Sequence, residues 1–97
     1  MENEITQSSG NIFEDLGFES GEAENLRVRA RLMAPLETYI QERGITQAEA
    51  ADELGTTQAR ISDLVNGKIQ SFSIDALINM LDRAGLAVDV DVRPKTS

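Results

Sequence analysis

The chemistry open to this chain is limited first by the side chains that it lacks. Its 97 residues include no histidine and no cysteine. A Ser-His-Asp triad, imidazole acid–base catalysis, a thiolate nucleophile and metal sites built from these residues are therefore excluded. Carboxylates are plentiful, but Asp52 with Glu53 and Asp89 with Asp91 are expected on solvated faces or an edge strand. Catalysis by paired carboxylates needs a concave, partly dry setting. We therefore predict that the protein is not an enzyme and uses no cofactor.

A second group of side chains is suited to hydrogen bonding with nucleic acid. One side of an expected helix presents short or hydrogen-bonding residues without aliphatic bulk, namely Thr57, Gln58, Ala59, Ser62 and Asp63. Ile61 and Leu64 lie on the opposite side and are expected to anchor the helix to a core. A merely solvated helix more typically carries Lys and Glu. This face is therefore a candidate for reading base edges in the major groove of DNA.

Two short helices around a glycine are expected to position these residues. Thr46 and Glu49 form a capping box that opens a helix over residues 47–54. Either Thr56 or Thr57 can cap a second helix that reaches Val65. Gly55 between them adopts a positive φ at little steric cost and allows a sharp turn. The pattern over residues 47–66 predicts a helix-turn-helix.

The flanking segments predict more helix and one strand. Apolar spacing predicts a helix over residues 22–43 that Ser20 caps, that Gly44 ends and that Pro35 kinks or breaks near residues 31–35. Ser73 caps a last helix over residues 74–84. The expected core residues are Ala23, Leu26, Ala30, Met33, Leu36, Ile40, Ala48, Ala51, Leu54, Ile61, Leu64, Val65, Leu77, Ile78 and Leu81.

Residues 86–93 alternate between apolar and polar side chains, which predicts a half-buried β-strand. No second strand pattern occurs in the chain, and one strand cannot satisfy its own backbone groups. The strand therefore pairs with its copy across a two-fold dimer or packs alone as an extended tail. We expect the dimer.

The charge is uneven along the chain. The formal net charge is −8, but residues 1–25 carry seven acids and no base, whereas residues 26–70 carry six of each sign. We predict a flexible acidic arm over residues 1–21 and a helix-turn-helix domain with a C-terminal dimerisation strand over residues 22–94. The apolar cluster at residues 12–18 either anchors the arm on its own fold or docks on a partner.

No membrane span or secretion signal is expected. The longest apolar runs are three residues, and a span needs roughly 20. The N-terminus has neither a basic start nor an apolar stretch, so we expect a cytoplasmic protein.

The helix-turn-helix segment resembles the XRE family of phage-repressor-like proteins. The resemblance lies in residues 45–51 (ITQAEAA), 55–58 (GTTQ), 61–64 (ISDL) and 66–68 (NGK). Residues 9–18, 72–77 and 88–94 look like the HigA-like antitoxin branch of that family. Together these segments cover about residues 9–94.

The resemblance implies a mostly α, lambda-repressor-like bundle of four or five helices, with the C-terminal strand paired across a homodimer. It implies a transcriptional repressor that binds a palindromic operator in double-stranded DNA, often its own. It also implies a toxin partner that cleaves messenger RNA on ribosomes. The residues that we predict to contact DNA, from the resemblance and from the helix pattern, are Gln47, Thr56, Thr57, Gln58, Ala59, Arg60, Ser62, Asp63 and Lys68.

Within this set, Thr57, Gln58 and Ser62 are expected to read base edges, and Gln47, Arg60 and Lys68 to hold phosphates. At Ala59 the family often has a longer side chain, so direct contact there shrinks to a thymine methyl group. Asp63 either accepts from cytosine N4 or repels non-cognate sites. Arg60 is a phosphate contact or a partner of Asp63.

Two other binding functions remain as alternatives. Few basic side chains are expected near the polar face of the second helix. This also fits a helix-turn-helix scaffold that binds a protein partner and has no specific DNA binding. Arg27, Arg29 and Arg31 either add to the face or pair with the acids of the arm. An RNA-binding module is less favoured, because the few aromatic side chains read as core or anchor residues.

Overall fold

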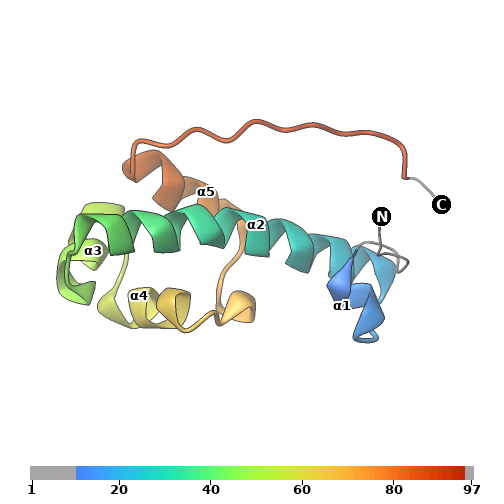
Figure 1. The fold of residues 1–97 in the computed structure, drawn as a ribbon, viewed down its shortest axis with the longest axis horizontal. Helices are drawn as coiled ribbons and strands as arrows, with labels where there is room; N and C mark the ends of the chain where they lie inside the picture. The colour runs from blue at the N-terminus through green and yellow to red at the C-terminus, as the bar shows by residue number, and fades with distance from the viewer. Residues whose placement is uncertain (1–10, 96–97) are drawn as a thin grey trace.

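The computed structural model describes residues 11–95. In chain order the helices of this part are α1 (Ile12–Asp15), α2 (Ser20–Arg43), α3 (Gln47–Leu54), α4 (Gln58–Val65), the 3-10 turn η1 (Ile69–Ser71) and α5 (Ile74–Arg83). In Figure 1, α2 forms a long spine, with α1 at its N-terminal end and the α3–α4 pair beside its C-terminal half. The prediction of a mostly helical chain is confirmed.

α2 is one continuous helix across Pro35, so the expected break is absent. A proline inside a helix costs about 3 kcal/mol, because it removes one hydrogen bond and crowds the preceding turn. Leu32, Met33 and Leu36 are buried on either side of Pro35. Burying each such side chain contributes about 1.5–3 kcal/mol, which offsets the cost.

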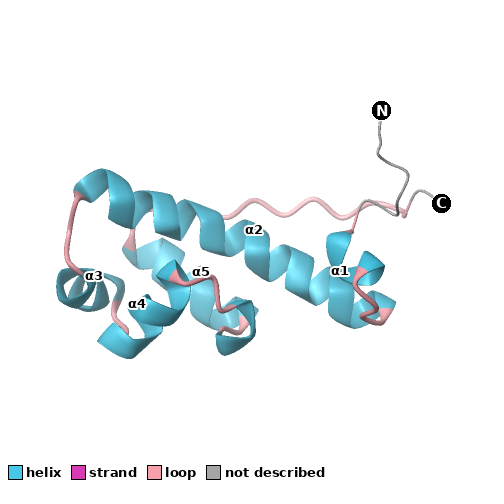
Figure 2. Cartoon of the chain, turned by 60° about the horizontal axis from the view of Figure 1, so that its bottom comes forward, coloured by secondary structure: helices cyan, strands magenta, loops and turns pink. Residues whose placement is uncertain are grey.

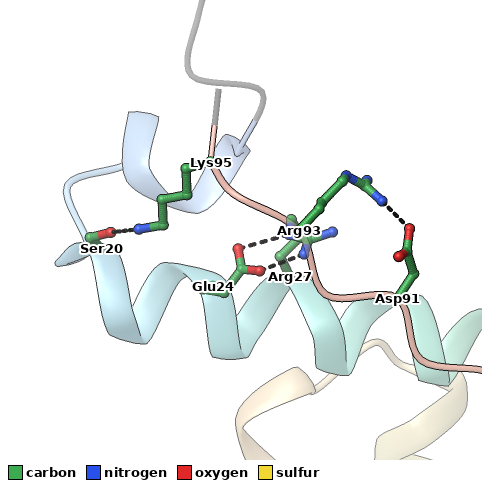
Figure 3. Close-up of polar contacts among 6 residues, drawn as sticks. All are labelled: Ser20, Glu24, Arg27, Asp91, Arg93 and Lys95. Carbon is green, nitrogen blue, oxygen red and sulfur yellow. Dashed lines mark hydrogen bonds and ion pairs between the residues drawn. The ribbon is translucent and has the colours of Figure 1, made fainter. Parts of the chain in front are cut away.

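The start of α2 also differs from the expectation. Ser20 is its first helical residue rather than its cap, and the N-cap residue Glu19 makes no side-chain capping bond. The Ser20 hydroxyl instead accepts a hydrogen bond from Lys95 Nζ at 3.0 Å (Figure 3). The C-terminal end is as expected, because Gly44 ends the helix with a φ of 61°.

The core lies where α2, α3, α4 and α5 meet. Leu36, Leu54, Ile61, Leu64 and Leu77 are fully buried there. Three expected core residues are exposed instead, namely Ala48, Val65 and Ile78. The core also contains four residues that were not expected in it, namely Leu32, Ala50, Phe72 and Met80.

The single chain does not form the predicted strand at residues 86–93, because its described residues 11–95 contain no strand (Figure 2). Residues 86–95 form an extended loop that returns from α5 toward the N-terminal end of α2. A strand is defined by hydrogen bonds to a neighbouring strand, and the chain places only helices beside this segment. Val90 and Val92 are 79% and 87% exposed.

The end of this loop meets α2 through charged and polar side chains (Figure 3). Beside the Lys95–Ser20 contact, Arg27 forms an ion pair with Glu24 at 2.6 Å. The hydrogen bond from Arg27 lowers the pKa of the Glu24 carboxyl, and the charge of Lys95 adds to this shift. Arg93 pairs with Asp91 within the loop itself.

The N-terminal part of the described chain is ordered by local contacts. The Asn11 side chain caps α1 by accepting from the Phe13 amide at 2.9 Å. Phe13 and Phe18 meet edge to face, with ring centroids 6.3 Å apart. Ile12 and Leu16 remain 64% and 68% exposed on this short helix. The first ten residues of the predicted arm lie outside the described part of the chain.

Candidate nucleic-acid interface

The exposed face of α4 begins at a capped N-terminus. Thr57 is the N-cap, and its hydroxyl accepts from the Arg60 amide at 3.1 Å. Thr57, Gln58 and Ala59 are exposed. The amides of the first turn have no partner within the helix, and the helix dipole makes this end partly positive. An anionic backbone is therefore attracted to the end of α4 that carries Gln58.

The opposite face of α4 is anchored. Ile61 and Leu64 are both 0% exposed and belong to the main core. Ser62 and Asp63 lie between the two faces and are half-buried. The helix therefore cannot rotate without exposing two large aliphatic side chains, so the orientation of its polar face is set by packing.

Gly55 and Arg83 fix the turn between α3 and α4. Gly55 has a φ of 69° and ends α3. The Arg83 guanidinium, from the end of α5, donates to the backbone carbonyls of Glu53 at 3.2 Å and Asp52 at 3.4 Å. A Cβ at position 55 would lie 2.7 Å from Arg83 Nε. A side chain at position 55 would therefore displace the arginine that caps α3.

A second contact fastens α3 to α2. The Tyr39 hydroxyl donates to Glu53 Oε1 at 2.8 Å, and Arg43 forms an ion pair with Glu53 Oε2 at 3.2 Å. Arg43 also lies 5.1 Å above the Tyr39 ring. The hydrogen bond lowers the pKa of Glu53, and Arg43 lowers it further. The same bond raises the pKa of the Tyr39 hydroxyl.

Arg60 contacts Ser71 and Phe72 rather than Asp63 in this structure. Its guanidinium donates to the backbone carbonyl of Ser71 and lies 5.8 Å from the centroid of the Phe72 ring. Asp63 forms its ion pair with Lys68 instead, at 4.0 Å. Two roles were expected for Arg60, a phosphate contact or an ion pair with Asp63. The ion pair with Asp63 is not formed in this structure. The Lys68 side chain remains 63% exposed.

The other predicted site residues lie at the starts and ends of the two helices. Gln47 is the first residue of α3 and is half-buried. Thr56 follows the turn glycine, and its amide donates to the Ala51 carbonyl at 2.9 Å. The Asn66 amide lies 3.5 Å from the Ser62 hydroxyl, at the far end of α4. The nine predicted residues thus belong to one continuous stretch of α3, α4 and the loop after it.

Sequence reasoning missed one contributor to this region, Arg83, and offered two alternative roles for another, Arg29. Arg83 stabilises the turn from about thirty residues away, and no local pattern indicates that contact. Arg29 of α2 lines a pocket with Thr56 and Arg60. Three alternate arginines at positions 27, 29 and 31 signalled only that part of α2 is basic.

Comparison with known proteins agrees with this geometry. A family model described as a helix-turn-helix domain matches residues 12–93. A solved structure whose name assigns it to the XRE family of transcriptional regulators shares 32% sequence identity with the chain at a TM-score of 0.69. The match covers 76% of this chain and 83% of that one. The chain belongs to the XRE family of helix-turn-helix proteins. None of the curated proteins matches it.

Membership of the XRE family confirms the resemblance drawn from residues 45–68, whereas the HigA-like branch stays a prediction. The part of this XRE-family chain that the structure describes contains no helix long and apolar enough to cross a membrane. The individual DNA-contacting residues and the cellular location also stay predictions.

Proposed function

We propose that this XRE-family protein is a sequence-specific DNA-binding transcriptional repressor. The observation that carries the proposal is the pairing of an exposed polar N-terminal face on α4 with a fully buried Ile61 and Leu64 behind it. A helix held in this way can enter the major groove without reorganising, so little ordering entropy is lost on binding.

The roles of individual residues follow from their positions. Thr57, Gln58 and Ser62 are proposed to meet base edges, with Ala59 contacting at most a thymine methyl group. Gln47, Thr56 and Lys68 are proposed to lie against the phosphate backbone on either side. Lys68 lies 4.0 Å from Asp63 and its side chain is 63% exposed, so it can reach a phosphate from this position.

We also propose a homodimer joined through residues 86–93. This segment is extended, and none of its residues from 87 to 93 forms a backbone hydrogen bond with another described residue. Unpaired extended backbone is a template for strand addition by a second copy. Two α4 helices about 34 Å apart would then read a palindrome with half-sites roughly 10 base pairs apart.

An antitoxin role is the finer part of the proposal. Its support is the acidic segment at residues 1–25 and the exposed pair Ile12 and Leu16 within it. A basic protein partner would be attracted to such a surface and could cover the two aliphatic side chains. We propose that this partner is a toxin whose gene lies beside that of the repressor.

Selection from random duplexes tests the repressor function. The full-length protein should enrich a palindrome, and it should bind that sequence at least 10³-fold more tightly than a scrambled duplex at the same salt concentration. Failure to enrich any sequence, together with equal weak binding to all duplexes, would contradict the proposal. That outcome would favour the protein-binding scaffold, which is consistent with the net charge of −8.

A further inference from the structure

A pocket of about 500 Å³ lies beside the reading helix, where α2, α4, η1 and α5 meet. Its lining is Arg29, Thr56, Arg60, Gln70, Ser71, Phe72, Ser73, Ala76 and Met80. These residues include two guanidinium groups and no carboxylate. In a chain with 17 acids and 9 bases, a pocket whose charged groups are all positive is unusual.

Neither guanidinium is neutralised within residues 11–95. Arg29 donates through Nε to the Asn25 side chain at 2.6 Å, which is a neutral acceptor. Arg60 donates through one terminal nitrogen to the Ser71 carbonyl, also neutral. By contrast, Arg27, Arg43 and Arg93 each form an ion pair with a carboxylate. Among residues 11–95, the terminal nitrogens of Arg29 and the other donors of Arg60 therefore have no anionic partner.

The rest of the lining suits an anion that carries an organic group. Thr56, Gln70, Ser71 and Ser73 supply neutral side chains able to donate hydrogen bonds. Phe72 and Met80 are 3% and 5% exposed and form an apolar floor together with Ala76. An apolar wall keeps water from one side of the site, which strengthens attraction between a guanidinium and an anion.

We propose that this pocket binds the oxyanion of a phosphate ester between Arg29 and Arg60. Guanidinium groups match the geometry of phosphate oxygens, and the volume lies within the usual range for small-ligand sites. The ester is either a backbone phosphate of bound DNA or the phosphate of a small molecule. Because Arg60 belongs to α4 and Thr56 to the turn before it, either ligand contacts the helix-turn-helix directly.

The first arm of the test uses inorganic phosphate and the full-length protein without DNA. Nitrogen-15 NMR follows the Nε–H signals of Arg29 and Arg60 during the titration. These signals should shift saturably, and Arg29→Gln should weaken the apparent affinity at least tenfold. Arg31→Gln is the matched control, because Arg31 is exposed on the same helix and does not line the pocket.

The second arm uses random-sequence duplex DNA at several salt concentrations. A backbone phosphate in the pocket predicts that Arg29→Gln lowers the slope of log affinity against log salt by about one, whereas Arg31→Gln leaves it unchanged. A response in the first arm alone assigns the pocket to a small phosphate ester. A response in the second alone assigns it to the DNA backbone, and responses in both indicate that the two ligands compete.

Absence of both responses in a folded protein would overturn the proposal. The first arm does not depend on the proposed function, since it contains no DNA. A protein that binds no duplex but shows the saturable arginine shifts would refute the repressor while leaving the anion pocket in place. Circular dichroism of each variant establishes that the fold is retained.

Discussion

At the scale of single residues, substitutions of Gln58 and Lys68 are expected to weaken DNA binding in different ways. Gln58→Ala removes a proposed base contact and should cost about 1–3 kcal/mol on the selected operator, with relaxed preference at one base pair. Lys68→Ala removes a proposed phosphate contact and should weaken binding to all duplexes alike, with a salt slope smaller by about one. Titrations of operator and scrambled duplexes at several salt concentrations measure both effects.

Val65 provides the control for these variants. It lies on α4 and is 41% exposed, yet it is at the opposite end of the helix from Gln58. Val65→Ala should therefore leave operator preference unchanged. If Gln58→Ala and Lys68→Ala also leave affinity for the operator unchanged, the α4 face is not the DNA-binding surface.

Gly55→Ala tests the turn between α3 and α4. A non-glycine residue in the left-handed region costs about 1–2 kcal/mol. The new methyl group would also push Arg83 off the Glu53 and Asp52 carbonyls, adding about 1 kcal/mol for the lost hydrogen bonds. The free energy of unfolding, measured in urea, should fall by the sum of the two costs.

Gly67→Ala separates the two contributions to that sum. Gly67 has a φ of 70°, almost the same as Gly55, but a Cβ there would meet open space. It should show the backbone cost alone. Equal destabilisation by the two variants would mean that Arg83 moves aside freely and does not stabilise the turn.

At the scale of elements, the contact between α2 and α3 should make stability depend on pH. Folding lowers the pKa of Glu53 below 4.5, so its contribution is complete above that value and is lost as the pH falls through the folded pKa. Folding raises the pKa of Tyr39 above 10.0, so its contribution is complete below that value and is lost as the pH rises through the folded pKa.

Two variants test this dependence through the melting temperature. Tyr39→Phe and Glu53→Gln should both melt lower than the unmodified protein near neutral pH. Glu53→Gln should in addition flatten the fall in melting temperature below about pH 4.5. Glu42→Gln, on an exposed position of α2, is the matched control. If the melting temperature falls equally below about pH 4.5 in Glu53→Gln and in the unmodified protein, this carboxylate does not contribute to stability.

Most helix ends were predictable from the sequence, because capping is local, although the start of α2 was not. The capping box of Thr46 and Glu49 and the caps Thr57 and Ser73 lie where expected. The continuous path of α2 through Pro35 was not predictable, because it depends on leucines buried against other helices. The strand at residues 86–93 is absent from the single chain for a related reason. Alternation describes the side chains, whereas a strand also requires a partner backbone.

The candidate site also has parts that the sequence predicts and parts that it does not. Its residues could be chosen from the sequence, since the exposed and buried sides of α4 follow from helical spacing. The direction of Arg60 could not, because its partners Ser71 and Phe72 belong to a turn that has no sequence signature of its own. The pocket beside it depends on four elements meeting, so only the structure indicates it.

At the scale of the whole molecule, oligomeric state is expected to depend on the C-terminal loop. Sedimentation at micromolar concentration should give twice the 10.6 kDa chain mass for the full-length protein. A chain ending after Leu86 should sediment as a monomer and bind a palindrome more weakly, while its affinity for a single half-site should be retained. Truncation after Leu86 keeps the amide that donates to the Leu81 carbonyl at the end of α5.

Lys95→Ala serves as the comparison for the truncation. It removes the hydrogen bond to Ser20 and the positive charge that acts on Glu24, but it leaves the backbone of residues 86–93 intact. It should therefore remain dimeric. A truncated chain that still sediments at twice its mass would place the dimer interface elsewhere on the protein.

The hydrogen bond between Lys95 and Ser20 has a consequence for protein engineering. It holds the last described residue beside the start of α2, next to α1 and far from the turn between α3 and α4 (Figure 1). A short peptide linker from Lys95 to Asn11 could therefore close the backbone into a ring with little rearrangement. Closing a ring of this size removes conformational freedom mainly from the unfolded chain, by roughly 4.6 kcal/mol in the loop-entropy model. Such a ring would also prevent the C-terminal loop from exchanging between two subunits.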